Sequence, residues 1–264
     1  MTEPSIVAQG YDAVYEAMPR GPTLARLWKE HAAGADYPDD FSHISFVTVA
    51  DLRELAAAMR LTGASRFGDI ACGMAGPSLW IARETGAHLA GVDFSRVAIA
   101  EAQARAEALS LASLATFTVG SFADTGLDAG SLDAAMTIDA LQYAPDKRAA
   151  FREFARILRP GGVLAFFAFE LSAERTAGLP AIGDDPVGDY RPLLAEAGFE
   201  VLRYEQTPRW HERLFAAYGA AVEAQAAMQQ EMGPLATAAL LSEMTLTLQQ
   251  DIYSGRVLAV STVP

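Results

Sequence analysis

Hydrophobic and polar positions follow two periods along residues 66–206. Short runs that are apolar or alternating indicate strands, and segments with apolar residues three and four apart indicate helices. The strands are expected at 66–70, 88–93, 115–119, 132–138, 163–169 and 199–206, and the helices at 77–85, 96–109, 147–158 and 187–197. This alternation predicts an α/β protein with a parallel sheet that is covered by helices on both faces.

The segments on either side are helical by the same criterion. Residues 4–33 show helical spacing with a break at Gly21-Pro22, after which Thr23 is expected to cap the second piece. Thr48 is expected to cap a helix at 49–60, and a helical stretch from Trp210 to about Gln250 precedes a last strand at 256–262. We therefore expect one domain, made of a helical lid at 1–62, a core at 63–206 and 254–264, and a helical cap insertion at 207–253.

The turn after the first core strand carries the clearest functional signal. Asp69 stands near the end of that strand, and the turn that follows contains the small residues Ala71, Gly73, Ala75 and Gly76. Small residues let the backbone approach a ligand, and the N–H groups of the next helix face it. Asp93 ends the second strand twenty residues after Gly73, the usual distance for a carboxylate that binds a ribose diol. The chain is predicted to bind a nucleoside-containing cofactor.

The turn by itself suits either NAD or S-adenosylmethionine (SAM). A carboxylate at Asp69 would repel a pyrophosphate but tolerate a cationic cofactor. Alanines also stand where two glycines of the dinucleotide pattern are expected. Both details favour SAM.

Five segments, in order, resemble the motifs of the class I SAM-dependent methyltransferases. The segments are 69–76, 91–95, 119–124, 132–141 and 158–163. The chain looks like the branch that modifies sugars, polyketides and related small molecules. The resemblance implies a doubly wound, seven-stranded, mostly parallel sheet with its last strand antiparallel. It also implies SAM as cofactor and S-adenosylhomocysteine (SAH) as product.

The resemblance assigns residues to the cofactor. Asp93 would hold the ribose hydroxyls, Phe94 would cover an adenine face, and Gly73 and the carbonyl of Ile138 would lie near the methionine portion. Ser121-Phe122 stands where the family commonly has an acidic residue for the adenine amino group, so serine is a departure there. The expected cofactor residues are Tyr11, Asp69, Ala71, Gly73, Asp93, Phe94, Ser121, Phe122, Ile138 and Asp139. For Asp69, orientation of the turn is an equal alternative, as is capping of the next turn for Asp139. A plain core position is the alternative for Phe94 and Phe122. Tyr11 and Tyr15 equally suit an aromatic stripe that packs the lid onto the core.

Methyl transfer also needs an aligned nucleophile and, for some acceptors, a base. Small-molecule members of the family often place a histidine after the fourth strand, but Gln142 and Tyr143 stand there, which excludes a histidine base at this point. The candidate catalytic residues are His43 in the lid loop, Glu170 after the fifth strand, His211 at the start of the cap, and Tyr143. A surface or structural role is the alternative for each histidine, and a loop cap or an arginine partner for Glu170.

The composition limits the classes of partner that the protein is expected to bind. The net charge of −13 and the pI of about 4.7 disfavour nucleic acid and anionic membranes. The single Cys72 cannot form an internal disulfide and suits a reducing, cytoplasmic setting. No signal peptide, membrane span or metal-binding motif is visible in the sequence. A small-molecule acceptor is the expected partner, and a homodimer is possible.

The leading hypothesis is SAM-dependent methyl transfer to a hydroxyl, or to an amine or activated carbon, of a small metabolite. The alternative is a SAM-binding, methyltransferase-like enzyme that catalyses a rearrangement, cyclisation or decarboxylation without methyl transfer. A non-catalytic partner with a decayed site and an NAD-dependent dehydrogenase are further alternatives. The intact Gly73 and Asp93 argue against the former, and Asp69 argues against the latter.

Overall fold

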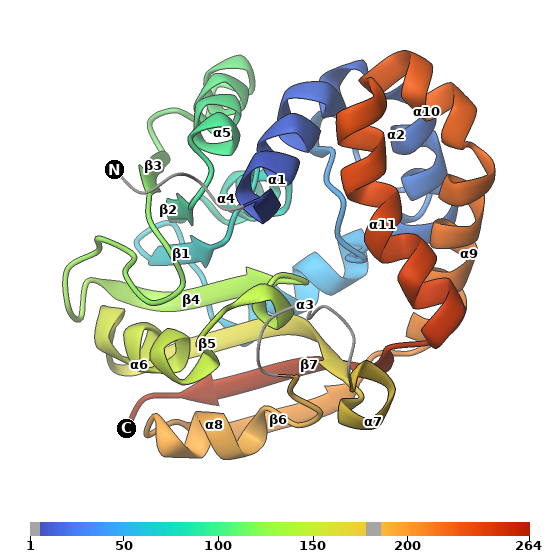
Figure 1. Ribbon diagram of the computed structural model, residues 1–264. Helices are drawn as coiled ribbons and strands as arrows, with labels where there is room; N and C mark the ends of the chain where they lie inside the picture. The colour runs from blue at the N-terminus through green and yellow to red at the C-terminus, as the bar shows by residue number, and fades with distance from the viewer. Residues whose placement is uncertain (1–5, 178–185) are drawn as a thin grey trace.

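The computed structural model describes residues 6–177 and 186–264, with side chains described from residue 10 onward. Within these ranges a seven-stranded sheet has the order β3-β2-β1-β4-β5-β7-β6 (Figure 1). The strands are β1 (Arg66–Ile70), β2 (His88–Asp93), β3 (Ala115–Val119), β4 (Leu132–Ile138), β5 (Leu158–Leu171), β6 (Glu200–Gln206) and β7 (Tyr253–Thr262). The expected doubly wound α/β fold is confirmed.

The five strands β1 to β5 run parallel, and β7 lies antiparallel between β5 and β6. β5 is longer than the pattern predicts because its pairing extends from Leu158, opposite Leu132, to Leu171, opposite Tyr253. The carboxyl ends of the parallel strands all meet at one edge of the sheet. In open α/β sheets, ligands bind beyond this edge.

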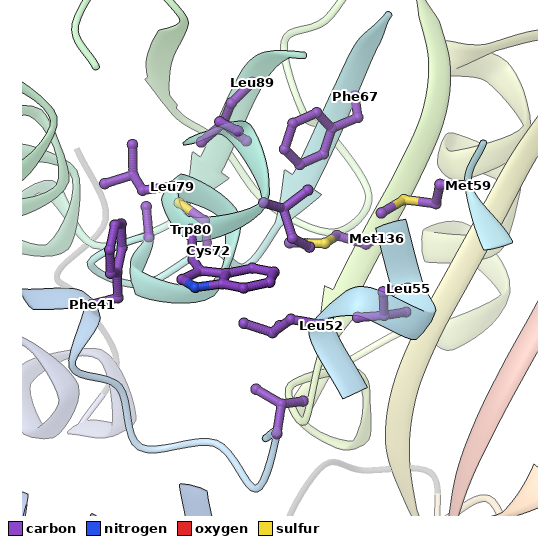
Figure 2. Packing of buried hydrophobic residues seen from close by; sticks show 14 of the residues in the cluster. Phe41, Leu52, Leu55, Met59, Phe67, Cys72, Leu79, Trp80, Leu89 and Met136 are labelled. Atoms are coloured by element: carbon purple, nitrogen blue, oxygen red, sulfur yellow. The ribbon is translucent and has the colours of Figure 1, made fainter. Parts of the chain in front are cut away.

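One face of the sheet is covered by α3 (Val49–Ala58), α4 (Gly76–Thr85) and α5 (Arg96–Ala108). Thr48 begins α3 with the expected cap, since its side chain accepts a hydrogen bond from the Asp51 N–H and Asp51 bonds back to the Thr48 N–H. Figure 2 shows the core beneath these helices, where Trp80 of α4 lies among side chains from α3 and from strands β1 and β4.

The opposite face is covered by α6 (Lys147–Ile157) and α8 (Arg191–Glu196). Because successive strand residues point to opposite faces, Phe166 of β5 packs under these helices and Phe167 packs under the other layer. α8 is shorter than the predicted 187–197. It begins only where Asp189 accepts the Arg191 N–H and Pro192 occupies the first turn.

The lid and the cap insertion pack together as one helical layer. Its helices are α1 (Ile6–Ala17), η1 (Met18–Arg20), α2 (Pro22–Trp28), η2 (Lys29–Ala33), α9 (Trp210–Glu223), α10 (Gln225–Met232) and α11 (Pro234–Gln250). Figure 1 shows α1 and α2 in blue beside α10 and α11 in orange and red. The predicted cap at Thr23 is wrong: Gly21 precedes α2, and Thr23 instead donates to Glu231 of α10 through its N–H and its hydroxyl.

The predicted boundaries of the lid and core also include residues 1–5 and 178–185, which lie outside the described residues. No helix in the described part of the chain is long and apolar enough to cross a membrane. Three short elements complete the chain: η3 (Asp39–Phe41), η4 (Leu141–Tyr143) and α7 (Ala173–Thr176).

Candidate cofactor and acceptor site

The turn between β1 and α4 is held by hydrogen bonds from its own backbone. Ala71, Gly73 and Ala75 all have positive φ (65°, 52° and 57°), so the chain reverses within a few residues. The Gly73 N–H donates to Asp93 Oδ2 (2.8 Å), and the Ser95 N–H donates to Asp93 Oδ1 (2.9 Å). Asp93 therefore lies directly against the turn. Each of its oxygens keeps a lone pair for a further donor.

Gly76 permits the lid loop to touch this turn. A Cβ on Gly76 would lie 2.2 Å from the carbonyl oxygen of Phe41 and 2.7 Å from that of Ser42. Only glycine allows the backbone to approach so closely. Segments 34–47 and 71–76 are thereby held in contact, and the lid loop forms one wall of the site.

Asp69 lies beneath the turn, where it is 3% exposed. Burial raises the pKa of its carboxyl to about 7, with a smaller contribution from Asp93 and an opposing hydrogen bond from Ser78. At neutral pH this carboxyl is poised between its two protonation states. Orientation of the turn and contact with a cationic ligand both stay compatible with this position.

A cavity lies at the turn, and it is lined by Tyr15, His43, Asp69, Gly73, Gly76 and Ile138 among others. Nδ1 of His43 accepts the Ser45 N–H (3.0 Å), so in the neutral ring the proton is on Nε2. Nε2 is buried without a hydrogen-bond partner. Burial lowers the pKa of His43 to about 3. This geometry does not support the predicted base role, because one nitrogen is engaged and the other is a donor.

Two tyrosines of α1 cover the turn. A Cβ on Gly73 would lie 3.2 Å from the Tyr15 hydroxyl oxygen. The Tyr11 ring lies 6.2 Å from that of Tyr15 and edge-on to Phe94, with centroids 6.3 Å apart. Phe94 is 44% exposed, which is unusual for a phenylalanine and leaves its ring free for a ligand. Its predicted contact with adenine stays a prediction.

The predicted adenine-side pair lies in the turn after β3. The Ser121 N–H donates to the Asp124 carbonyl, and its hydroxyl accepts the Asp124 N–H, so serine organises this turn. Phe122 packs its ring against Phe154 of α6. The ligand contacts predicted for both residues stay predictions.

The Asp139 carboxylate is hydrogen-bonded to other groups of the protein. Its carboxylate receives Nε and Nη2 of Arg256 (2.8 and 3.0 Å) and the Phe46 N–H (2.7 Å). Arg256 is 1% exposed and lies 4.6 Å above the Phe167 ring. The pair joins the end of β4 to β7 and to the lid. We therefore regard Asp139 as a positioning residue rather than a direct cofactor contact.

Two further catalytic candidates lie away from the turn. Glu170 accepts the Tyr204 hydroxyl (2.5 Å) and Nε2 of Gln206 (2.6 Å), both on β6, which is neither the loop cap nor the arginine pair considered from sequence. His211 is half exposed, stacks on Phe215 and lies 3.0 Å from Asp251. Neither residue lines the cavity at the turn. Their predicted base roles stay predictions.

Tyr143, the remaining candidate, belongs to a cluster that sequence reasoning missed. Its hydroxyl donates to both oxygens of Glu243 (2.7 and 2.8 Å). The hydroxyls of Tyr253 (2.7 Å) and Tyr218 (3.5 Å) donate to the same carboxylate. One feature of the sequence could have revealed this cluster: Glu243 is the only charged residue in the seventeen residues of α11. A lone carboxylate in an apolar helix needs partners.

The residues at the turn suit SAM. The unpartnered Nε2–H of His43 offers a donor for a carboxylate, Asp93 offers acceptors for a diol, and Gly73 and Gly76 leave the backbone accessible. When bound, SAM supplies an electrophilic methyl group on a sulfonium. The alanines at two glycine positions both adopt the left-handed conformation, so the turn keeps its tight shape at a cost in backbone strain.

Comparisons with known proteins agree with this geometry. Residues 68–166 match the family described as a methyltransferase domain. The chain is 26% identical over 208 residues to 27-O-demethylrifamycin SV methyltransferase of Amycolatopsis mediterranei, covering 75% of this chain and 74% of that protein. It is 27% identical over 151 residues to sterol 24-C-methyltransferase ERG6B of Gibberella zeae, covering 52% of this chain and 40% of that protein.

Among solved structures, the cyclase SpnF aligns with a TM-score of 0.74 at 22% identity, over 98% of this chain and 95% of that chain. At this identity the likeness concerns the fold. The ordered motifs, the matched domain and the strand order together support a class I SAM-dependent methyltransferase, with SAM as its cofactor.

Proposed function

We propose that this protein transfers the methyl group of SAM to a hydroxyl of a small-molecule metabolite. The observation that carries the proposal is the contact between Asp93 and Gly73 at the turn, which puts a diol-binding carboxylate beside the cofactor cradle. The helical layer of α1, α2 and α9 to α11 would enclose the acceptor away from water.

Oxygen is the favoured methyl acceptor. The relative named for 27-O-demethylrifamycin SV matches along 74% of its length, whereas the sterol 24-C-methyltransferase matches along only 40%. The net charge of −13 supports a small organic acceptor over a nucleic acid.

Calorimetric titration with SAH tests the cofactor half of the proposal. Asp93→Ala removes two charge-assisted hydrogen bonds to a diol, so we expect affinity to fall by about 3 kcal/mol, or roughly 150-fold. Glu212→Gln serves as the control, because Glu212 is exposed and its ion pair among the described residues is with Arg209. Equal affinity of Asp93→Ala and the wild type would contradict the proposed binding mode.

A non-methylating reaction on bound SAM is the second candidate, and the fold shared with the cyclase SpnF favours it. Incubation with methyl-labelled SAM and a metabolite extract separates the two. Label in an extracted product supports methyl transfer. Conversion of a metabolite with all label retained in SAM supports the second candidate.

A further inference from the structure

Glu243 and its tyrosines occupy the junction of four elements. The carboxylate comes from α11, and its hydroxyl donors come from η4, α9 and β7. The donors are neutral groups, so these bonds satisfy the carboxylate without neutralising its charge. Such an arrangement costs stability, because a hydrogen-bonded ion still loses its hydration. A functional role for the charge would explain why the protein keeps it.

The cluster is connected to the cofactor turn through Tyr11. The Tyr143 and Tyr11 rings are 6.1 Å apart, and Tyr11 in turn touches Tyr15 and Phe94. Tyr218 and Tyr253 are buried, whereas Tyr143, Tyr11 and Glu243 keep intermediate exposure. Tyr143 thus lies on the partly exposed side of the cluster, next to Tyr11.

A tyrosine that donates its proton to a carboxylate keeps lone pairs on its oxygen. Tyr143 Oη can therefore accept a proton from a second hydroxyl while its own proton points at Glu243. The other candidate bases lack this arrangement: His43 presents an N–H, and Glu170 lies against β6. A hydroxyl acceptor, unlike a pre-ionised one, must give up a proton when it is methylated.

Resting on the proposed function, we propose that Tyr143 and Glu243 form a proton relay that selects hydroxyl compounds as methyl acceptors. As the new carbon–oxygen bond forms, the carbon–sulfur bond breaks and sulfur keeps its electron pair. The hydroxyl proton passes to Tyr143 Oη, and the Tyr143 proton passes to Glu243. The carboxylate ends as a carboxylic acid, so the positive charge of the sulfonium and the negative charge of Glu243 disappear together.

The relay requires Glu243 to be ionised before each turnover. Burial raises the pKa of Glu243, and hydrogen bonds from Tyr253, Tyr143 and Tyr218 oppose the shift. The other groups that face the cluster are Tyr11 of α1 and the Asp139–Arg256 pair. Activity should therefore rise with pH through the Glu243 pKa, and this acidic limb should disappear in Glu243→Gln.

The test compares Glu243→Gln and Tyr143→Phe with Glu170→Gln, a matched control that also removes a tyrosine-bonded buried carboxylate. Each variant is titrated with SAH, and SAH production is followed with a panel of phenols, hydroxyquinones and aliphatic alcohols. We expect SAH affinity within about threefold of the wild type for all three variants. For Glu243→Gln and Tyr143→Phe, kcat should fall by about 10²–10⁴ with little change in KM.

A purely structural role would not reproduce two of these results. In the relay, the loss in Glu243→Gln shrinks for phenols with more acidic hydroxyls, because they need less help from a base. Infrared titration of the wild type without acceptor should show a carboxyl band, absent in Glu243→Gln, whose midpoint coincides with the acidic limb of kcat. A loss that is equal for all phenols, or an acidic limb that does not follow the titration of Glu243, overturns the relay.

Wild-type transfer to amines or carbon but to no hydroxyl of the panel overturns the relay and leaves the methyltransferase intact. Absence of SAH binding by the wild type refutes the proposed function itself.

Discussion

Arg256→Met would test how strongly the buried ion pair holds the end of β4 to β7. The guanidinium gives Asp139 two bonds of 2.8 and 3.0 Å, and it is 1% exposed. Its removal leaves the Asp139 carboxylate with the Phe46 N–H at 2.7 Å but without this cation. A buried carboxylate stripped of its counter-ion is strongly destabilising.

The expected decrease in the free energy of unfolding follows from the loss of this ion pair. Breaking one side of a buried pair costs about 3–5 kcal/mol, whereas replacing both sides with well-packed neutral groups is often close to neutral. For a chain of this length, the single variant should lower Tm by roughly 10 °C. Asp139→Asn/Arg256→Met should recover most of this, because asparagine tolerates the positive φ of 50° at position 139.

Urea and thermal unfolding of both variants, beside Arg159→Met, provide the assay. Arg159 forms a 2.8 Å pair with Asp133 but is 62% exposed, so its loss should cost less than about 1 kcal/mol. A cost below about 1 kcal/mol for Arg256→Met, or a double variant no more stable than the single one, would refute the reasoning. Retention of SAH binding in the double variant would show that the Asp139 carboxylate is not a direct cofactor contact.

Three other substitutions have defined outcomes. Gly76→Ala forces a Cβ to 2.2 Å from the Phe41 carbonyl, so it should cost about 1–3 kcal/mol and weaken SAH binding, measured by urea unfolding and calorimetry. Asp69→Asn should stabilise the protein without cofactor increasingly from pH 4 to 7. In the folded wild type the Asp69 carboxyl keeps its proton to about pH 7, whereas in the unfolded chain it releases the proton near the ordinary value of 3.8. The difference in free energy of unfolding between the two proteins should reach about 4 kcal/mol, and Tm measured across pH would follow it. A constant difference across pH would contradict the raised pKa. Thr48→Ala removes the cap that accepts the Asp51 N–H and should cost about 1 kcal/mol; no measurable loss would show that the cap is dispensable.

The core of the fold was predictable because local pattern and tertiary structure agree there. Strands β1 to β4 have the predicted bounds, and Thr48 caps α3 as expected. Predictions failed where a distant partner decides the conformation. Thr23 caps nothing because Glu231, more than two hundred residues away, takes its N–H and hydroxyl. The long stretch after Trp210 breaks into three helices, and the second break is at Gly233.

Some residues of the candidate site were likewise predictable from sequence, and others were not. The turn and Asp93 were visible from spacing, because both follow strands whose ends must meet. The base candidates were not, because a histidine in a sequence does not reveal its tautomer or its neighbours. His43 reaches the cavity, yet its Nδ1 is taken by Ser45. Glu243 went unnoticed because its partners come from three other elements.

The position of β7 has a consequence for the order of folding. β6 occupies the edge of the sheet, and its described pairing is with β7 alone, although residues 207–252 separate the two strands. During synthesis β6 leaves the ribosome long before its partner exists, and an unpaired strand edge invites association with other chains. Closing so long a loop also slows the pairing. Completion of the sheet and docking of α9 to α11 should therefore occur as one late, cooperative event, and slowed translation of 207–252 should increase aggregation of the nascent protein.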